Sequence, residues 1–272
     1  MPFLIWIMLE NILKPDWLEK KPRFAFLIGF VYSIIGIVAA AIIFPRSQGI
    51  ASIAFLSLLL VPSLNSILKI EEIQDTKSRG FSIKRIFTDH SDVLQVYLLL
   101  FLGIFLAYGL FSIRFPELLV SGLFDSQLRI IGITGNAGAA SFDFASIFIN
   151  NFKVLIIFLV LSLIIGAGSI LFLAWNASVW GVIFGYVAVH SGDAFNTFAL
   201  TFFKVAPHMI TEASAYFFAI VGGGIMSQAV LREKVGSAKF NYVMKDGGLF
   251  IIASMILLII GVFLEVYFYG LL

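Results

Sequence analysis

Two ionisable side chains, His208 and Glu212, lie within one apolar stretch of the sequence, residues 204–230, which is long enough to cross a bilayer. Because they are four residues apart, a helix would place them on one face, about one turn from each other. Pro207 directly precedes them, where a proline either suits the first turn of a helix or kinks a longer one. Ionisable groups are costly in lipid, so we expect this face to point into protein or water.

This pair supports two interpretations. In the first, His208 and Glu212 share a proton or coordinate an ion, with His190, Asp193 and Asn176 on the preceding segments as partners. In the second, Glu212 lies in the first turns of a helix, where the helix dipole favours a negative charge, and His208 touches interfacial water. The sequence alone leaves both interpretations open.

The same residues could also supply nitrogen and oxygen ligands to a metal, since His190, Asp193, His208 and Glu212 would suit such a site if two helices met. The His-Glu-x-x-His pattern of zinc proteases is absent, however. The simpler interpretation makes Asp193 a helix N-cap and places His190 in a loop. We therefore expect no metal, no cofactor and no catalytic residue. The chain has no cysteine, which excludes disulfides and thiolate chemistry.

The composition requires a membrane protein. Hydrophobic residues make up 60% of the 272 residues, charged residues only 12%, and the mean hydropathy is +1.03. Soluble domains average about 25% charged residues. The expected fold is all-α, a polytopic transmembrane helix bundle of about six or seven spans with short interfacial or re-entrant helices. The net charge of +2 gives no reason to expect nucleic-acid binding.

The first half of the chain predicts three spans. Residues 3–13 precede them. This segment is too short to cross a bilayer, so we expect it to form a short helix in the membrane interface. The charged stretch 69–92 suggests a solvated helical hairpin at the membrane surface. The three spans cover residues 24–44, 50–68 and 93–113.

The second half is less regular. Residues 114–151 are too polar and glycine-rich to span, apart from a short interfacial helix at 142–151 with Ser141 as its N-cap. The segment 177–189 is short for a span, and 194–206 reads as a second short helix that lies flat or re-enters the membrane, with Asp193 as its N-cap. The expected spans are 153–175, 177–189, 207–231 and 247–268.

Three groups of glycines are expected to let helices pack closely: Gly181-x3-Gly185, Gly166 with Gly168, and Gly222 to Gly224. The last group could alternatively act as a hinge.

Basic residues predict the orientation. Segments 1–23, 69–92 and 232–246 hold thirteen of the eighteen Lys and Arg residues, which favours a cytoplasmic N-terminus and an outside C-terminus. We divide the chain into an N-terminal segment (1–23), a three-span unit (24–113, with the cytoplasmic loop 69–92) and a membrane core with the final span (114–272).

Three groups of residues in the second half carry a family resemblance. They are Asn150-Asn151 before a span with Gly166-Ala167-Gly168, Asn176 followed by Gly181, and Pro207-His208 with Glu212-Ala213 and Gly222-Gly223-Gly224. Through these motifs the second half resembles the SpoIIM family, the stage II sporulation protein M group of membrane proteins. The resemblance covers roughly residues 140–231, and the N-terminal hairpin and loop look like those of archaeal members. The sequence departs from the family pattern at Ala177 and Met209, where the family has glycine.

The resemblance implies a scaffold more than an enzyme. Sporulating bacterial members look like membrane components of a septal complex that contains peptidoglycan-degrading enzymes. We therefore expect a non-enzymatic scaffold or subunit of a membrane complex, in the cell membrane as a multi-pass protein. Its expected partners are the lipid bilayer and membrane or cytoplasmic proteins, including further copies of the chain. The alternative is a transporter or permease with a polar intramembrane site at His208 and Glu212 between broken helices.

Overall fold

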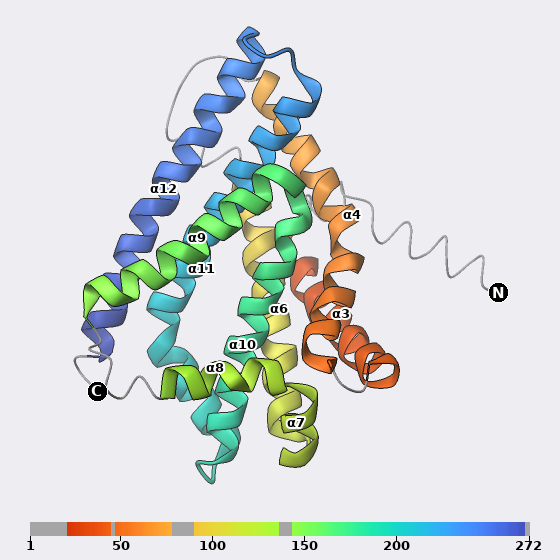
Figure 1. The fold of residues 1–272 in the computed structure, drawn as a ribbon, viewed down its shortest axis with the longest axis vertical. Helices are drawn as coiled ribbons and strands as arrows, with labels where there is room; N and C mark the ends of the chain where they lie inside the picture. Colours follow the sequence, from red (N-terminus) through yellow and green to blue (C-terminus); the bar gives the residue numbers. More distant parts are fainter. Residues whose placement is uncertain (1–20, 45–46, 78–89, 136–142, 270–272) are drawn as a thin grey trace, which may run out of the picture.

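The computed structural model describes residues 21–44, 47–77, 90–135 and 143–269, and the predicted helix at 3–13 lies outside these ranges. The described residues form helices and no strand, which confirms the all-α prediction. Within these ranges, seven helices are long and apolar enough to cross a membrane. Figure 1 shows them as a bundle with two short helices, α7 and α8, near one end. The seven are α3 (Arg23–Ile43), α4 (Gln48–Lys77), α6 (Ser91–Arg114), α9 (Phe144–Ile165), α10 (Ile170–Val189), α11 (Ala194–Arg232) and α12 (Ala238–Tyr269).

The first three spans agree with the prediction, and α3 packs against both α4 and α6. α4 continues past the expected end of its span, to Lys77, and so takes up the start of the predicted polar hairpin. The contact between α3 and α6 is close because it contains glycine: a methyl group added to Gly29 would lie 2.7 Å from the carbonyl oxygen of Leu100. α6 also packs against α10.

The polar stretch after α6 forms the two short helices, α7 (Glu117–Leu123) and α8 (Asp125–Gly135). Gln127 of α8 is fully buried, and its amide lies 3.4 Å from both the carbonyl oxygen of Gly49 and the hydroxyl of Ser178. The polar side chain of Gln127 is therefore covered by protein where α8 meets the bundle.

The boundary between the fourth and fifth spans was predicted wrongly. The chain turns at a short 3-10 helix, η2 (Gly166–Ser169), and not after residue 175. Gly166 ends α9 with φ +60°, a left-handed conformation that favours glycine. This glycine therefore caps a helix, although the sequence suggested a packing role. As a result α10 has 20 residues, enough for a full span, and Asn176 lies inside it.

The predicted interfacial helix at 142–151 is the beginning of α9, which continues without a break into the membrane-spanning part. Its N-cap is Asp143, whose carboxylate accepts a hydrogen bond of 3.0 Å from the backbone N–H of Ser146. The predicted cap, Ser141, lies outside the described residues. Hydrogen bonds from the side chain and then the backbone of Ser146 lower the pKa of Asp143 below its ordinary value.

The chain also runs without interruption through Pro207. Residues 194–206 and 207–231, expected as two elements, form the single 39-residue helix α11, with Pro207 inside it. The glycines Gly222 to Gly224 lie in the same unbroken helix and serve packing. Methyl groups added to Gly222 or Gly224 would each lie 2.7 Å from a side-chain carbon, of Phe250 and Leu68 respectively.

Candidate functional site

Glu212 of α11 is buried, with 6% of its surface exposed, and it lies where α9, α11 and α12 meet. The side-chain amide of Asn151, on α9, donates a hydrogen bond of 2.6 Å to Glu212 Oε1. On the α12 side, Gly261 makes room for the carboxylate, because a methyl group there would lie 2.7 Å from Glu212 Cγ. The expectation that this helix face points into protein or water is confirmed for Glu212, which lies in protein.

A second carboxyl group, Glu265 of α12, completes this contact. Glu265 shares hydrogen bonds with Glu212 and with Asn151, and it is half-buried. We call Asn151, Glu212 and Glu265 the carboxyl cluster. It joins three spans through side chains.

Sequence reasoning missed Glu265. It lies in the final apolar span, four residues after Gly261, so the two share one face of α12. The pair could have been noticed in the sequence. Gly261 lies one turn before the acidic Glu265, and this pattern inside a span indicates that another polar group packs against that face. Asn151, in contrast, belongs to one of the motifs noted in the sequence.

His208 is also buried, with 2% of its surface exposed, but it contacts a different neighbour. Its ring lies beside that of Trp180 on α10, with 6.1 Å between the ring centroids in an edge-on arrangement. The helix therefore places His208 and Glu212 one turn apart as predicted, with His208 next to α10 and Glu212 next to α9 and α12.

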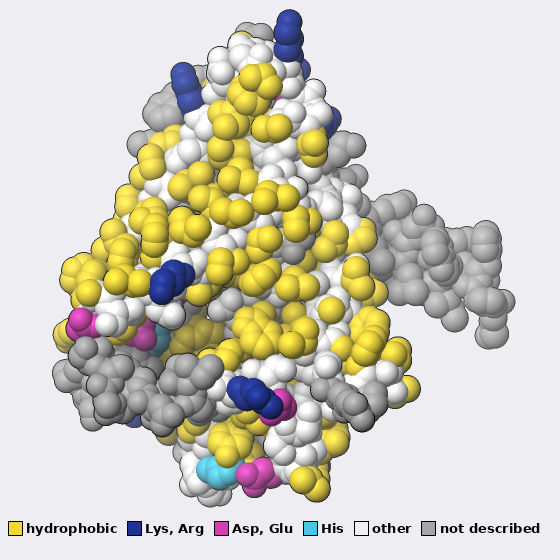
Figure 2. Space-filling model, in the orientation of Figure 1, with side chains coloured by type: hydrophobic (Ala, Val, Ile, Leu, Met, Phe, Trp, Pro, Cys, Tyr) yellow, Lys and Arg dark blue, Asp and Glu magenta, His cyan; other side chains and the backbone are white. Residues whose placement is uncertain are grey.

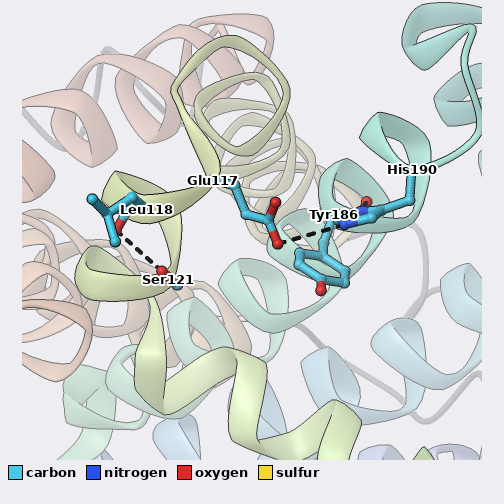
Figure 3. Close-up of polar contacts among 5 residues, drawn as sticks. All are labelled: Glu117, Leu118, Ser121, Tyr186 and His190. Atoms are coloured by element: carbon cyan, nitrogen blue, oxygen red, sulfur yellow. Dashed lines mark hydrogen bonds and ion pairs between the residues drawn. The ribbon is translucent and has the colours of Figure 1, made fainter.

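His190 lies at the far end of α10 and takes no part in the carboxyl cluster. Its Nδ1 is 2.8 Å from the carbonyl oxygen of Tyr186, one turn earlier in the same helix. Its Nε2 is 3.6 Å from Glu117 Oε1 at the start of α7, and both side chains are largely exposed. Figure 3 shows the imidazole between these two groups, with the separate Ser121–Leu118 hydrogen bond of α7 nearby.

The other predicted site residues have local roles. Asp193 is the N-cap of α11 and accepts a hydrogen bond of 3.3 Å from the backbone N–H of Asn196, as its simpler interpretation proposed. Asn176 donates its side-chain amide to the carbonyl oxygen of Phe172 in its own helix, at 2.9 Å. Pro207 lies within α11, where its carbonyl accepts from the Thr211 hydroxyl at 2.6 Å.

The six predicted residues therefore do not form one site. Asp193 caps the start of α11, and Ala194, the first residue of that helix, lies about 27 Å along it from Glu212, given 18 residues and a rise of about 1.5 Å per residue. His190 lies three residues before Asp193, at the end of α10. In the part of the chain that the structure describes, no group of three or more His, Cys, Asp or Glu side chains could hold a metal ion.

The face of the molecule in Figure 2 is mostly apolar, as expected for a surface that meets lipid. Acidic side chains reach this surface near the left edge, where the start of α9 in Figure 1 lies beside the end of α12.

Comparison with known proteins supports the family assignment. No curated protein and no solved structure matches the chain. A family model described as "SpoIIM: Stage II sporulation protein M" matches residues 24–268, which includes all seven spans except the first residue of α3 and the last of α12. The chain therefore belongs to the stage II sporulation protein M family.

Proposed function

We propose that the chain is a non-enzymatic integral membrane subunit that holds other proteins in a membrane complex. Membership of the stage II sporulation protein M family supports this role through the family resemblance described above. The observation that carries the proposal is the carboxyl cluster: Glu212 is buried, and its partners Asn151 and Glu265 come from neighbouring helices of the same chain. Polar groups that bond one another between helices are typical of architecture.

The test is the mass of the particle extracted from native membranes in a mild detergent. A scaffold subunit is expected to migrate as a complex larger than the single 30.1 kDa chain with its detergent, with other chains in fixed ratio. The Glu212→Gln variant keeps the shape of the side chain, and it is expected to retain the partners. Repeated isolation of a single chain without partners, after mild cross-linking in the membrane, would contradict the proposal.

We also propose that the protein lies in the cell membrane with its N-terminus in the cytoplasm. The α10–α11 and α11–α12 connections lie at opposite ends of the bundle in Figure 1. The basic residues near the second connection, among them Arg232, Lys234 and Lys239, are exposed and favour its cytoplasmic location.

The absence of cysteine makes the orientation easy to measure. Single cysteines at Ser191 and at Ser237, one in each connection, would be labelled with a membrane-impermeant maleimide on intact cells. We expect labelling of Ser191→Cys only, and labelling of Ser237→Cys alone would reverse the proposed orientation.

A second candidate function is proton-coupled transport, and the Glu212–Glu265 contact favours it specifically. Two neighbouring carboxyl groups within spans can pass a proton between them, and intramembrane acids often mark proton pathways. This transport hypothesis differs from the one based on the sequence in two ways. The α11 helix is continuous and not broken, and Glu265 takes the place expected for His208 beside Glu212.

Reconstituted vesicles distinguish the two functions. A transporter would dissipate an imposed pH gradient or carry a solute with it, as read by a trapped pH-sensitive dye, and Glu212→Gln and Glu265→Gln would each abolish the flux. Equal dye responses from vesicles with wild-type chain, either variant or no protein would eliminate this candidate and leave the scaffold proposal standing.

A further inference from the structure

The carboxyl cluster contains two acidic side chains and no basic one. Glu212 and Glu265 both lie in membrane-spanning helices, and within the described ranges no ion pair involves either of them. Two ionised carboxylates in contact repel each other strongly where the surroundings have a low dielectric constant. A cation bound between them would remove that repulsion.

A fourth polar group, the hydroxyl of Tyr216, lies beside the cluster. Tyr216 follows Glu212 by one turn on the same face of α11, its side chain stacks on Phe158 of α9 with 4.9 Å between the ring centroids, and only 8% of its surface is exposed. It interacts electrostatically with both Glu212 and Glu265, so its hydroxyl is directed at the pair. Among the residues that the structure describes, this hydroxyl has no hydrogen-bond partner. Buried polar groups in native proteins have a partner, so the Tyr216 hydroxyl indicates a ligand at the cluster.

The donor atoms that these side chains offer to a cation are all oxygens. They are the carboxylate oxygens of Glu212 and Glu265, the hydroxyl of Tyr216 and the amide oxygen of Asn151. Asn151 uses Nδ2 for its hydrogen bond to Glu212, and a half-turn about its last side-chain torsion presents Oδ1 instead. The ring of His208 lies against α10 and adds no nitrogen. An oxygen-only set of ligands suits Ca²⁺ or Mg²⁺ and not zinc or copper, which prefer nitrogen and sulfur.

We propose that the carboxyl cluster, together with Tyr216, binds one Ca²⁺ ion. Two carboxylates match the double charge of the ion, and the half-buried Glu265 leaves room for water molecules to complete its coordination. Ca²⁺ accepts an irregular set of ligands from long side chains, whereas Mg²⁺ requires a nearly ideal octahedron. The bound ion would hold α9, α11 and α12 together. The inference depends on neither function proposed above, because the mass of the complex and the vesicle flux test those functions, and the measurements below test cation binding.

The test is thermal unfolding of the full-length protein in detergent, titrated separately with CaCl₂ and MgCl₂ after removal of divalent ions with a chelator. We expect Ca²⁺ to raise the unfolding midpoint with half-saturation at about 0.1–1 mM, and to bind at least about tenfold more tightly than Mg²⁺. Glu212→Gln and Glu265→Gln should each abolish the response to Ca²⁺. Glu117→Gln, which removes an exposed carboxylate outside the cluster, is the matched control and should leave the response unchanged.

A further variant tests the hydroxyl without removing a charge. Tyr216→Phe keeps the aromatic ring against Phe158, so it should unfold like the wild type without Ca²⁺ and bind the ion about tenfold more weakly. The proposal is overturned if Ca²⁺ does not raise the midpoint of the wild-type chain at about 10 mM, well above the expected half-saturation. It is equally overturned if the two Gln variants respond like the wild type, because Ca²⁺ would then bind elsewhere, or if Mg²⁺ acts as strongly as Ca²⁺.

Discussion

The substitution Gly261→Ala tests whether the carboxyl cluster is packed as closely as the structure indicates. The added methyl group would lie 2.7 Å from Glu212 Cγ and 3.4 Å from its backbone nitrogen, so the Glu212 side chain must shift. Overpacking of this kind costs about 1–3 kcal/mol. An alanine in place of glycine inside a helix contributes about 0.5–1 kcal/mol in the opposite direction. We expect a net loss of up to about 2.5 kcal/mol in the free energy of unfolding.

Removing the Glu212 side chain should reverse the sign of the effect of Gly261→Ala on the free energy of unfolding. In a Glu212→Ala background the Cγ atom is gone, and the remaining backbone contact with Gly261 is of ordinary van der Waals length. Gly261→Ala should then stabilise the chain by about 0.5–1 kcal/mol, which gives a coupling between the two positions of about 1–3 kcal/mol. Gly248→Ala in the same helix is the matched control, because a methyl group there meets no atom within 4 Å, and it should stabilise in both backgrounds.

The assay is reversible unfolding in mixed micelles, followed by far-UV circular dichroism as the fraction of denaturing detergent rises. Each of the four chains in the cycle is measured with and without Gly248→Ala. The reasoning fails if Gly261→Ala has the same effect in the wild-type chain and in the Glu212→Ala variant, because the carboxylate side chain would then not occupy the space beside Gly261.

Three further outcomes are expected. Hydrogen bonds from Ser146 lower the pKa of Asp143, so the cap stabilises α9 at pH values above the unfolded-state aspartate pKa of about 3.9. This stabilisation is lost as the pH falls through the lower folded-state pKa. Amide exchange in the first turn of α9 should therefore accelerate only at such acidic pH, and in Asp143→Asn it should not depend on this titration. Gly181→Ala should destabilise by about 1–3 kcal/mol or more, since its methyl group would overlap the backbone of α6, and equilibrium unfolding that matches wild type would refute this close helix contact. Glu117→Gln should change the free energy of unfolding by less than about 1 kcal/mol, because its ion pair with His190 is largely exposed, and a larger loss that persists in high salt would show that the contact is more than a surface pair.

The spans were predictable from hydropathy, but their ends were harder to place. Residues 153–175 contain no polar residue after Lys153 except serines, so the sequence gives no hydropathy signal for the turn at Gly166. Only the backbone conformation of that glycine marks the end of α9. At Pro207 the error was the opposite one. A proline suggested a helix start, yet the flanking turns are held by packing against neighbouring helices, and the helix continues.

Of the candidate site, the sequence predicted only Glu212 and its buried environment. Burial of Glu212 followed from the cost of a charge in lipid, and the structure confirms it. Its partners come from α9 and α12, which are 61 and 53 residues away in sequence, and spacing within one helix cannot identify such contacts. His190 and Asp193 were grouped with it because they are polar and near in sequence. In the folded chain the length of α11 separates them from the cluster.

That length has a mechanical consequence. At about 1.5 Å per residue, the 39 residues of α11 extend about 58 Å, whereas the hydrocarbon layer is about 30 Å thick. Even at a tilt of about 40° the helix is longer than this layer is thick, so α11 must extend beyond the hydrocarbon. A force applied to the end of α11 outside the hydrocarbon would be transmitted along the helix to the carboxyl cluster. The helix would bend first at Pro207, because the backbone lacks an amide hydrogen there.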